Sequence, residues 1–368
     1  MTKARKIASY VLFPLSMWYG IGVMLRNLMF ALGIKSETAP HVTTIGVGNL
    51  STGGTGKTPM TEHLLRLLSD DYATAFLSRG YKRRTKGFVL ADGEPDAGRL
   101  GDEAAMVAAK FPGVTVAVCE QRLAGIRRLM QGEHRPDVVV LDDVYQHRQV
   151  KPTVNILLTE YGRPFFRDRI LPFGNLREFR SARHRANIVI VTKCPEKLDP
   201  VTKHNILLDL RVRNTQKVFF SYLEYGQPQP LFDPVGADPE GASHVLLLCG
   251  IANPRPLVDH VGKNRTVVLR QFPDHHAFTA KEILQVVQDF EAIEGDSKII
   301  LTTEKDAARL RAPQLAELLQ GLPVYQLPVQ VRFHPQHDYD FDTCIRSSVK
   351  ENITFLHSLH TAMNTFRG

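Results

Sequence analysis

Residues 41–58 have the sequence HVTTIGVGNLSTGGTGKT, and this stretch determines the predicted fold. Its first ten residues form a β-branched, largely apolar run, which is typical of a buried strand. The glycine-rich segment 48–58 comes next, and a helical pattern with Met60, Leu64 and Leu68 on its apolar side follows. A strand, a glycine-rich loop and a helix in this order are the context that a phosphate-binding loop requires.

The residue types of this loop suit the phosphates of ATP. Glycines let backbone N–H groups converge on phosphate oxygens, and the N-terminus of the helix adds a partial positive charge. We expect Lys57 to reach the β and γ oxygens and the Thr58 hydroxyl to bind Mg²⁺. A glycine-rich turn is the alternative, and Ser51 stands where the common motif has glycine. The predicted ATP-binding residues are Ser51, Thr52, Gly53, Gly54, Thr55, Gly56, Lys57 and Thr58.

Residues 137–143, with the sequence DVVVLDD, supply the second half of a nucleotide site. The β-branched run predicts a strand that is buried on both faces of a parallel sheet. Asp142 and Asp143 follow at its carboxyl end, where α/β sheets bind their ligands. Adjacent carboxylates at this place suit Mg²⁺, bound directly or through water. The alternative is a turn in which aspartate only caps the backbone.

Strands and helices alternate along much of the chain. Further strands are predicted at 72–77, 114–118, 155–159 and 187–191, and helical patterns separate several of them. This alternation predicts an α/β fold, with a parallel sheet of the P-loop NTPase type and helices on both faces.

The pattern changes near Gln216, where short strands at 218–222 and 231–232 flank a turn rich in Gly, Pro and Gln. New buried strands then begin at His244 and Ile299, which predicts a second, smaller α/β unit. The predicted organisation is an N-terminal helix (1–35), a P-loop domain (36–215), linker strands (216–243) and a C-terminal domain (244–368).

Composition and charge limit the class of protein. The chain has 368 residues, 43% hydrophobic and 23% charged, so a disordered chain and a multi-span membrane protein are excluded. Lys and Arg outnumber Asp and Glu by 46 to 38, which suits nucleic acid, an anionic membrane or a phosphorylated ligand. The four cysteines lie far apart with no CxxC, which favours a reducing compartment over a disulfide framework or a zinc site.

The N-terminal segment has three basic residues and then an uncharged run at 7–25. As a helix, this run would approach the thickness of the hydrocarbon core of a bilayer. A signal peptide, a membrane span and a buried core helix are the alternatives. A helix lying in the membrane interface, with Trp18, Tyr10 and Tyr19 at headgroup depth, fits the mixed hydropathy best.

Charged residues also mark three shorter segments. Arg79 ends a predicted strand in SRGY (78–81), so we expect it at the ligand-binding edge. Asp102 begins a helical pattern in GDE (101–103), and by position alone it would be a helix cap. The segment LPFGNLRE (171–178) and the basic cluster after it are either a solvated face or a contact surface for phosphate or lipid headgroups.

In order along the chain, these motifs resemble those of the tetraacyldisaccharide 4′-kinases, the lipid A 4′-kinases of Gram-negative bacteria. The matching motifs are GNLSTGGTGKTP, LSRGY, GDE, DDVYQHR, LPFGNLRE, CGIANP, FPDHHAF and TTEKDAARL. The resemblance implies a membrane-associated kinase of lipid A biosynthesis that uses ATP and Mg²⁺. Its acceptor would be the 4′-hydroxyl of tetraacyldisaccharide 1-phosphate, its product lipid IVA, and its location the cytoplasmic face of the inner membrane. The implied fold is two α/β/α units joined by a two-stranded linker.

The resemblance also assigns roles to individual residues. It implies that Asp102 accepts the proton of the sugar hydroxyl and that His275, from the second unit, orients that proton. ATP and lipid would then meet in a cleft between the units. Arg79 is our own further candidate for a phosphate contact, because it ends a strand at the same edge. The predicted catalytic residues are thus Asp102, His275 and Lys57, the predicted metal ligands are Thr58, Asp142, Asp143 and Glu178, and Arg177 is expected to contact phosphate or substrate.

Two other functions remain open at this point. One is a soluble P-loop kinase of a small metabolite, and the other is a nucleotide-dependent switch or partitioning ATPase. Val191, Thr192 and Lys193 resemble a guanine-binding NKxD motif only loosely, because Cys194 and Pro195 interrupt it. Nucleic acid is not an expected partner, because no recognisable binding module accompanies the basic excess.

Overall fold

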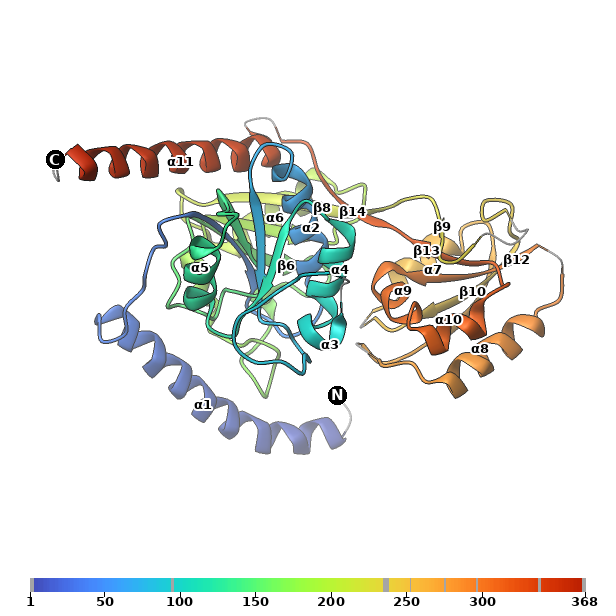
Figure 1. The fold of residues 1–368 in the computed structure, drawn as a ribbon. Helices are drawn as coiled ribbons and strands as arrows, with labels where there is room; N and C mark the ends of the chain where they lie inside the picture. The colour runs from blue at the N-terminus through green and yellow to red at the C-terminus, as the bar shows by residue number, and fades with distance from the viewer. Residues whose placement is uncertain are drawn as a thin grey trace. The chain divides into compact units, whose positions relative to one another are not determined.

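The computed structural model describes residues 3–93, 96–233, 238–251, 253–274, 276–295, 297–336 and 339–365. The chain divides into two compact units (Figure 1): unit 1 comprises 1–223 and 331–368, and unit 2 comprises 224–330. Each unit has its own largely parallel sheet with helices packed on it, which confirms the predicted α/β class.

Unit 1 is built on a nine-stranded sheet in the order β14-β8-β7-β6-β1-β5-β2-β4-β3. Pairing is parallel from β8 through β4, whereas β3 is antiparallel to β4. The strands are β1 (Thr43–Asn49), β2 (Thr74–Ser78), β3 (Val89–Leu90), β4 (Thr115–Val118), β5 (Val138–Leu141), β6 (Val154–Glu160), β7 (Ile188–Thr192), β8 (Lys217–Tyr225) and β14 (Val329–Phe333).

The central strands are buried on both faces. Every residue of β1, β2 and β5 is buried, which explains their continuous apolar sequence. Successive side chains of β5 enter different cores: Val138 and Val140 join one cluster, and Val139 and Leu141 join the other. The two faces therefore need separate layers of helices.

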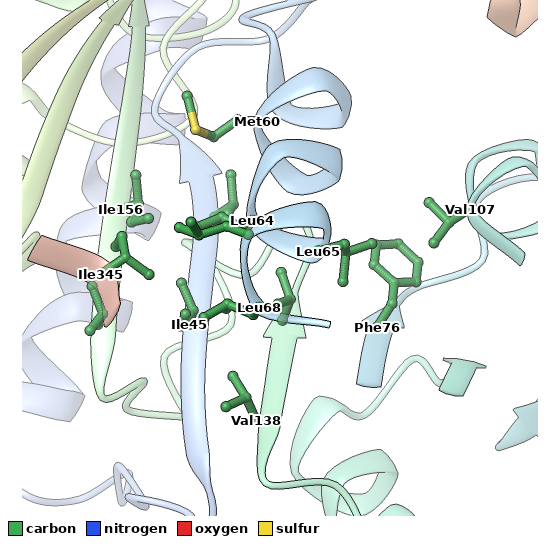
Figure 2. Close-up of a cluster of buried hydrophobic side chains, with 14 of the residues drawn as sticks. Ile45, Met60, Leu64, Leu65, Leu68, Phe76, Val107, Val138, Ile156 and Ile345 are labelled. Atoms are coloured by element: carbon green, nitrogen blue, oxygen red, sulfur yellow. The ribbon is translucent and has the colours of Figure 1, made fainter. Parts of the chain in front are cut away.

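Helices α2, α4 and α11 cover one face of the sheet, while α5 and α6 cover the other. In Figure 2, Leu64 and Leu68 of α2 point toward Ile45 of β1, and Ile345 of α11 lies beside Ile156. The helical elements of unit 1 are α1 (Lys3–Ala31), α2 (Lys57–Leu68), α3 (Ala97–Leu100), α4 (Asp102–Lys110), η1 (Phe165–Arg167), α5 (Arg122–Gln131), η2 (Arg180–Arg185), α6 (Pro200–Leu210) and α11 (Phe341–Thr365).

Unit 2 repeats this layered plan on a smaller scale. Its five strands have the order β11-β10-β12-β13-β9, and only β9 pairs antiparallel. Helices α8, α9 and α10 pack on one face and α7 on the other. The elements are β9 (Gln229–Pro230), β10 (His244–Cys249), α7 (Arg255–Val261), β11 (Thr266–Gln271), α8 (Ala280–Glu291), β12 (Lys298–Thr303), α9 (Glu304–Leu310), α10 (Pro313–Leu319) and β13 (Val324–Leu327).

The structure corrects the predicted domain boundaries. The C-terminal domain was expected to span 244–368, but 331–368 belongs to unit 1. The reason is that Phe341, Ile345 and Val349 of α11 are buried in the core that α2 and β1 also form. Strands β8 and β14 are neighbours in the sheet, and each crosses a boundary between the units. These two strands therefore connect the units, instead of the two strands expected within 216–243.

We expect Ile345→Ala to destabilise unit 1, because this side chain is fully buried between α11 and the sheet. Removing a buried isoleucine costs about 2–5 kcal/mol in the free energy of unfolding. Urea unfolding would measure this loss, and hydrogen exchange would locate it. Phe355→Ala is the control on the same helix, because that ring is 57% exposed. A loss of protection confined to unit 2 would contradict the assignment of α11.

Candidate active site

The loop from Gly48 to Thr58 joins the end of β1 to the start of α2, as the sequence predicts. Gly56 caps α2 with φ 85°, a left-handed conformation that glycine adopts without strain. Within the loop, Asn49 Nδ2 donates a hydrogen bond to Thr55 Oγ1 at 2.7 Å. Lys57 and Thr58 lie in the first turn of α2, where free N–H groups and the helix dipole favour an anion.

Two neighbouring segments hold the loop in place. From β7, Thr192 Oγ1 donates to the carbonyl of Thr55 at 2.8 Å. Lys193 Nζ donates to the carbonyl of Gly54 at 2.5 Å and pairs with Glu160 at 3.2 Å. On another side, the carbonyl of Asn175 accepts from the N–H of Thr52 at 2.8 Å. The loop is therefore fixed by contacts from β7 and from the segment that precedes Arg177.

The acidic pair follows β5, which lies next to β1 in the sheet. Lys57 Nζ lies 3.6 Å from Asp143 Oδ1. Arg177 Nη1 donates to both oxygens of the same carboxylate, at 3.2 and 3.1 Å. A lysine of the loop, an acid after β5 and an arginine from a distant segment therefore form one ion-paired cluster.

This arrangement requires a glycine at position 48. A Cβ atom there would lie 2.6 Å from the Cβ and 2.9 Å from the backbone nitrogen of Tyr145. The N–H of Val144 donates to the carbonyl of Val47 at 3.2 Å. The turn after the acidic pair thus packs directly against the backbone at the end of β1.

The pKa values of the two carboxylates are shifted in opposite directions. Burial, reinforced by the negative charge of Glu103, raises the pKa of Asp142 to about 7. Burial also acts to raise the pKa of Asp143, but the positive charges of Lys57 and Arg177 outweigh it and hold that pKa below its usual range. A divalent cation beside Asp142 would supply the counter-charge that its burial requires.

The side chains at the end of β5 and at the start of α2 have the oxygen ligands that Mg²⁺ prefers. Within the described ranges, the structure has no cluster of three or more His, Cys, Asp and Glu side chains that could hold a metal by itself. Mg²⁺ at a nucleotide site needs only one or two carboxylates, because phosphate oxygens and waters complete its shell. Asp142, Asp143 and the Thr58 hydroxyl are the candidate ligands at this edge.

The GDE and SRGY motifs pack backbone against backbone. A Cβ at Gly101, which has φ 84°, would lie 2.6 Å from the carbonyl oxygen of Tyr81. Asp102 is the first residue of α4 rather than its cap, which is Gly101. The negative charge of Glu103, the second residue of α4, acts to raise the pKa of Asp142. Arg79 is exposed and directly precedes Gly80 and Tyr81, which Gly101 contacts.

Glu178 has partners other than a metal. Its carboxylate is fully buried and pairs with Arg185 at 2.8 and 2.9 Å. Arg26 and Asn27 of α1 complete the set at 3.4 and 3.3 Å. Although burial opposes it, these partners hold the pKa of Glu178 below its usual value. The prediction that Glu178 binds metal is therefore replaced by a role as the centre of a buried ion-pair group.

Sequence reasoning missed Arg122, which lies beneath the acidic pair. Its guanidinium is 2% exposed and donates to the carbonyls of Cys119 and Asp142 at 2.7 and 3.1 Å. Burial lowers its pKa to about 10, so it stays charged at neutral pH. The sequence signal that could have identified Arg122 was a basic residue shortly after the strand predicted at 114–118.

The motifs of unit 2 that the sequence analysis linked to catalysis are described only in part, because His275 lies outside the described residues. Its neighbour His276 bonds through Nε2 to both carboxylate oxygens of Glu282, at 2.9 and 3.0 Å. Asp306 of the TTEKD motif is fully buried and accepts from the N–H of Gly250 in the CGIANP motif at 2.8 Å. The second contact thus joins the CGIANP and TTEKD motifs to each other, and the first joins the FPDHHAF motif to α8.

The outer face of α1 is apolar and exposed. Trp18 is 75% exposed, Met17 56% and Leu25 53%, whereas Ser16 and Val23 on the inner face are buried. The side chain of Tyr10 lies outside the described residues. In the part of the chain that the structure describes, no helix is long and apolar enough to cross a membrane.

A glycine-rich loop between the central strand and a helix, with an acidic pair at the end of the next strand, defines a P-loop nucleotide-binding protein. A family model for tetraacyldisaccharide-1-P 4′-kinase matches residues 8–349. The chain therefore belongs to the tetraacyldisaccharide 4′-kinase family, which confirms the resemblance drawn from the motifs.

Individual relatives agree with this assignment. The chain is 42% identical to a tetraacyldisaccharide 4′-kinase of Flavobacterium johnsoniae over 344 residues, covering 93% of this chain and 98% of the relative. A tetraacyldisaccharide 4′-kinase of Phocaeicola vulgatus is 40% identical over 348 residues, with coverages of 93% and 95%. A crystal structure of an "apo" form of LpxK from Aquifex aeolicus in complex with ATP has a TM-score of 0.69 and 25% identity, over 95% of this chain and 99% of that one.

We expect the stability contributed by Glu282 to depend on pH. Its bond to His276, with those to Thr279, lowers its pKa from 4.5 to about 2. A depressed folded-state pKa stabilises the fold above the unfolded-state pKa, and this stabilisation is lost as pH falls toward 2. The difference in unfolding midpoint between the wild type and Glu282→Gln should therefore shrink from pH 7 to pH 3. Glu291→Gln, on the exposed end of α8, is the control; a constant difference for Glu282→Gln would contradict the pairing.

Proposed function

We propose that this chain transfers the γ-phosphoryl group of ATP to the 4′-hydroxyl of tetraacyldisaccharide 1-phosphate, which gives lipid IVA. The main support is that Lys57, Asp143 and Arg177, from three separate segments, form one ion-paired cluster in a member of this kinase family. The neighbouring structure solved with ATP supports ATP as the phosphoryl donor.

On the ATP side, the chain contributes positioning and positive charge. The N–H groups of 51–58 and the N-terminus of α2 would bind the phosphates, and Lys57 would contact the β and γ oxygens. Arg177 and Lys57 both pair with the carboxylate of Asp143. Arg177 is therefore placed to reach the phosphate oxygens on which charge develops during transfer. Arg79, at the neighbouring strand end, is a further candidate for this role.

On the acceptor side, we assign Asp102 as the base that takes the proton of the sugar hydroxyl. Its support is its place at the start of α4, next to Glu103, whose charge acts on Asp142. His275 as the group that orients this proton stays a prediction. Bound Mg²⁺ would neutralise charge on the phosphate oxygens, with Thr58, Asp142 and Asp143 holding it.

The acceptor is a lipid, so we propose that the enzyme works peripherally at the cytoplasmic face of the inner membrane. Support comes from the outer face of α1, where Trp18, Met17 and Leu25 are exposed together. A helix with such a face binds at the boundary between headgroups and acyl chains. The surplus of 46 basic over 38 acidic residues would strengthen contact with anionic lipid.

We expect Asp102→Asn to lower kcat by at least about 10²-fold, because general base catalysis contributes about that much. Lys57→Ala should lower kcat by a similar factor, of about 10² or more, through lost charge stabilisation. The assay is transfer of labelled phosphate from ATP to the purified disaccharide lipid, with nucleotide binding measured in parallel.

Asp102→Asn should still bind ATP, which separates a role in proton transfer from a role in binding. Asp209→Asn is the matched control, since its pair with Arg167 is exposed and worth little. Near-normal turnover of Asp102→Asn would remove this residue from the mechanism. Equal turnover of acylated and deacylated disaccharide would instead favour a kinase of a soluble acceptor.

The double substitution Trp18→Ser and Leu25→Ser should weaken binding to phosphatidylethanolamine–phosphatidylglycerol vesicles by at least about tenfold. Each large apolar side chain loses about 1.5–3 kcal/mol of burial when fully inserted. Vesicle co-sedimentation measures the partition. Leu208→Ser is the control, because that side chain is 61% exposed on α6 rather than on α1. A partition that the double substitution leaves unchanged would exclude this face as the membrane contact.

A further inference from the structure

The inner face of α1 contacts the segment that carries Arg177. Its residues Ser16, Gly20, Val23 and Asn27 recur at helical spacing, and the first three are buried. This stripe lies opposite the apolar residues to which we assign membrane binding. The helix therefore has two faces with different chemistry.

This stripe and the adjacent, partly exposed Tyr19 contact the segment 170–179. Ser16 Oγ donates to the carbonyl of Ile170 at 2.9 Å. The hydroxyl of Tyr19 donates to the carbonyl of Arg177 at 3.0 Å. At Gly20, a Cβ would lie 3.0 Å from the ring of Phe179, so the helix and this segment are in close contact.

Glu178 strengthens the attachment. It is fully buried, and Asn27 and Arg26 of α1 supply two of its three partners. If α1 moved away, Glu178 would keep only Arg185 as a partner, and a buried carboxylate is costly when part of its set of partners is lost.

The opposite side of the same segment holds the active site. The N–H of Arg177 donates to the carbonyl of Leu50 at 2.7 Å, and its guanidinium binds Asp143. Two residues earlier, Asn175 accepts from Thr52 of the phosphate loop. The segment is thus held between α1 and the phosphate loop, and Arg177 is bonded to both through its backbone.

We infer that α1 is part of the catalytic apparatus, and that Tyr19 and Asn27 are positioning residues which hold Arg177 against Asp143 and the phosphate loop. This inference rests on the proposed kinase function only where its test measures kcat; the hydrogen-exchange measurement does not depend on that function. The helix that meets the lipid surface would then fix a phosphate-binding arginine through side chains that touch neither ATP nor the sugar. Membrane contact and catalysis would share one element.

The experiment uses the full chain with Tyr19→Phe, Asn27→Ala and both together. Tyr19→Phe removes one hydroxyl and keeps the ring, and Asn27→Ala removes one partner of Glu178. Because one lost hydrogen bond corresponds to about 2–10-fold, we expect the two lost bonds to lower kcat of the double variant by about 4–100-fold. The KM values for ATP and lipid, and vesicle partition, should stay within about twofold of wild type. Tyr72→Phe with Asn205→Ala is the matched control and should keep wild-type kcat.

Two further measurements separate positioning from loss of folding. Asn27→Gln, which keeps the amide donor to Glu178, should recover part of kcat, whereas Asn27→Leu, which fills similar space without a donor, should not. Hydrogen exchange should become faster in 169–178 of the double variant while α6 and unit 2 keep their protection.

The outcomes are distinct. Unchanged kcat and unchanged exchange in 169–178 would overturn the inference, and so would a loss confined to lipid KM and vesicle partition, which would make α1 an anchor only. A wild-type chain without activity on the disaccharide lipid would refute the proposed function instead. The exchange result would then decide the positioning role by itself.

Discussion

The parallel pairing of β1 with β5 is the constraint on which the site depends. Gly46 of β1 lies opposite Leu141 of β5, so both strands end at the same edge of the sheet. The phosphate loop and the acidic pair therefore emerge side by side, and Gly48 lets the turn at Tyr145 approach the backbone of β1. The ion pair between Lys57 and Asp143 also depends on a left-handed backbone at Asp143, whose φ is 46°, a conformation that aspartate tolerates better than most residues.

The core of this site could be predicted from the sequence because its signals are local. The loop lies between an apolar strand and a helix, and the acidic pair follows a β-branched run, so a short window contains each element. Helix α11 was placed in the wrong unit because its apolar spacing fits any core, and only tertiary packing selects the one around Ile345. The partners of Glu178 were missed because Arg26 lies far from it in sequence.

The structure also shows why α1 was only half understood from hydropathy. Its apolar residues suggested a helix at a membrane, and the outer face has that character. Hydropathy gave no role to the polar residues of its inner face, yet Ser16 and Asn27 bond to the segment 170–178. Polar residues in a mainly apolar helix can thus be the ones that attach it to its own domain.

The carboxylate of Asp143 is shared by two cations, Lys57 and Arg177. One negative and two positive side chains leave this cluster with one surplus positive charge. That surplus would attract an anion such as a phosphate chain even while both cations stay on the acid. The acid also restrains two long, flexible side chains before any nucleotide binds, so less side-chain entropy would be lost on binding.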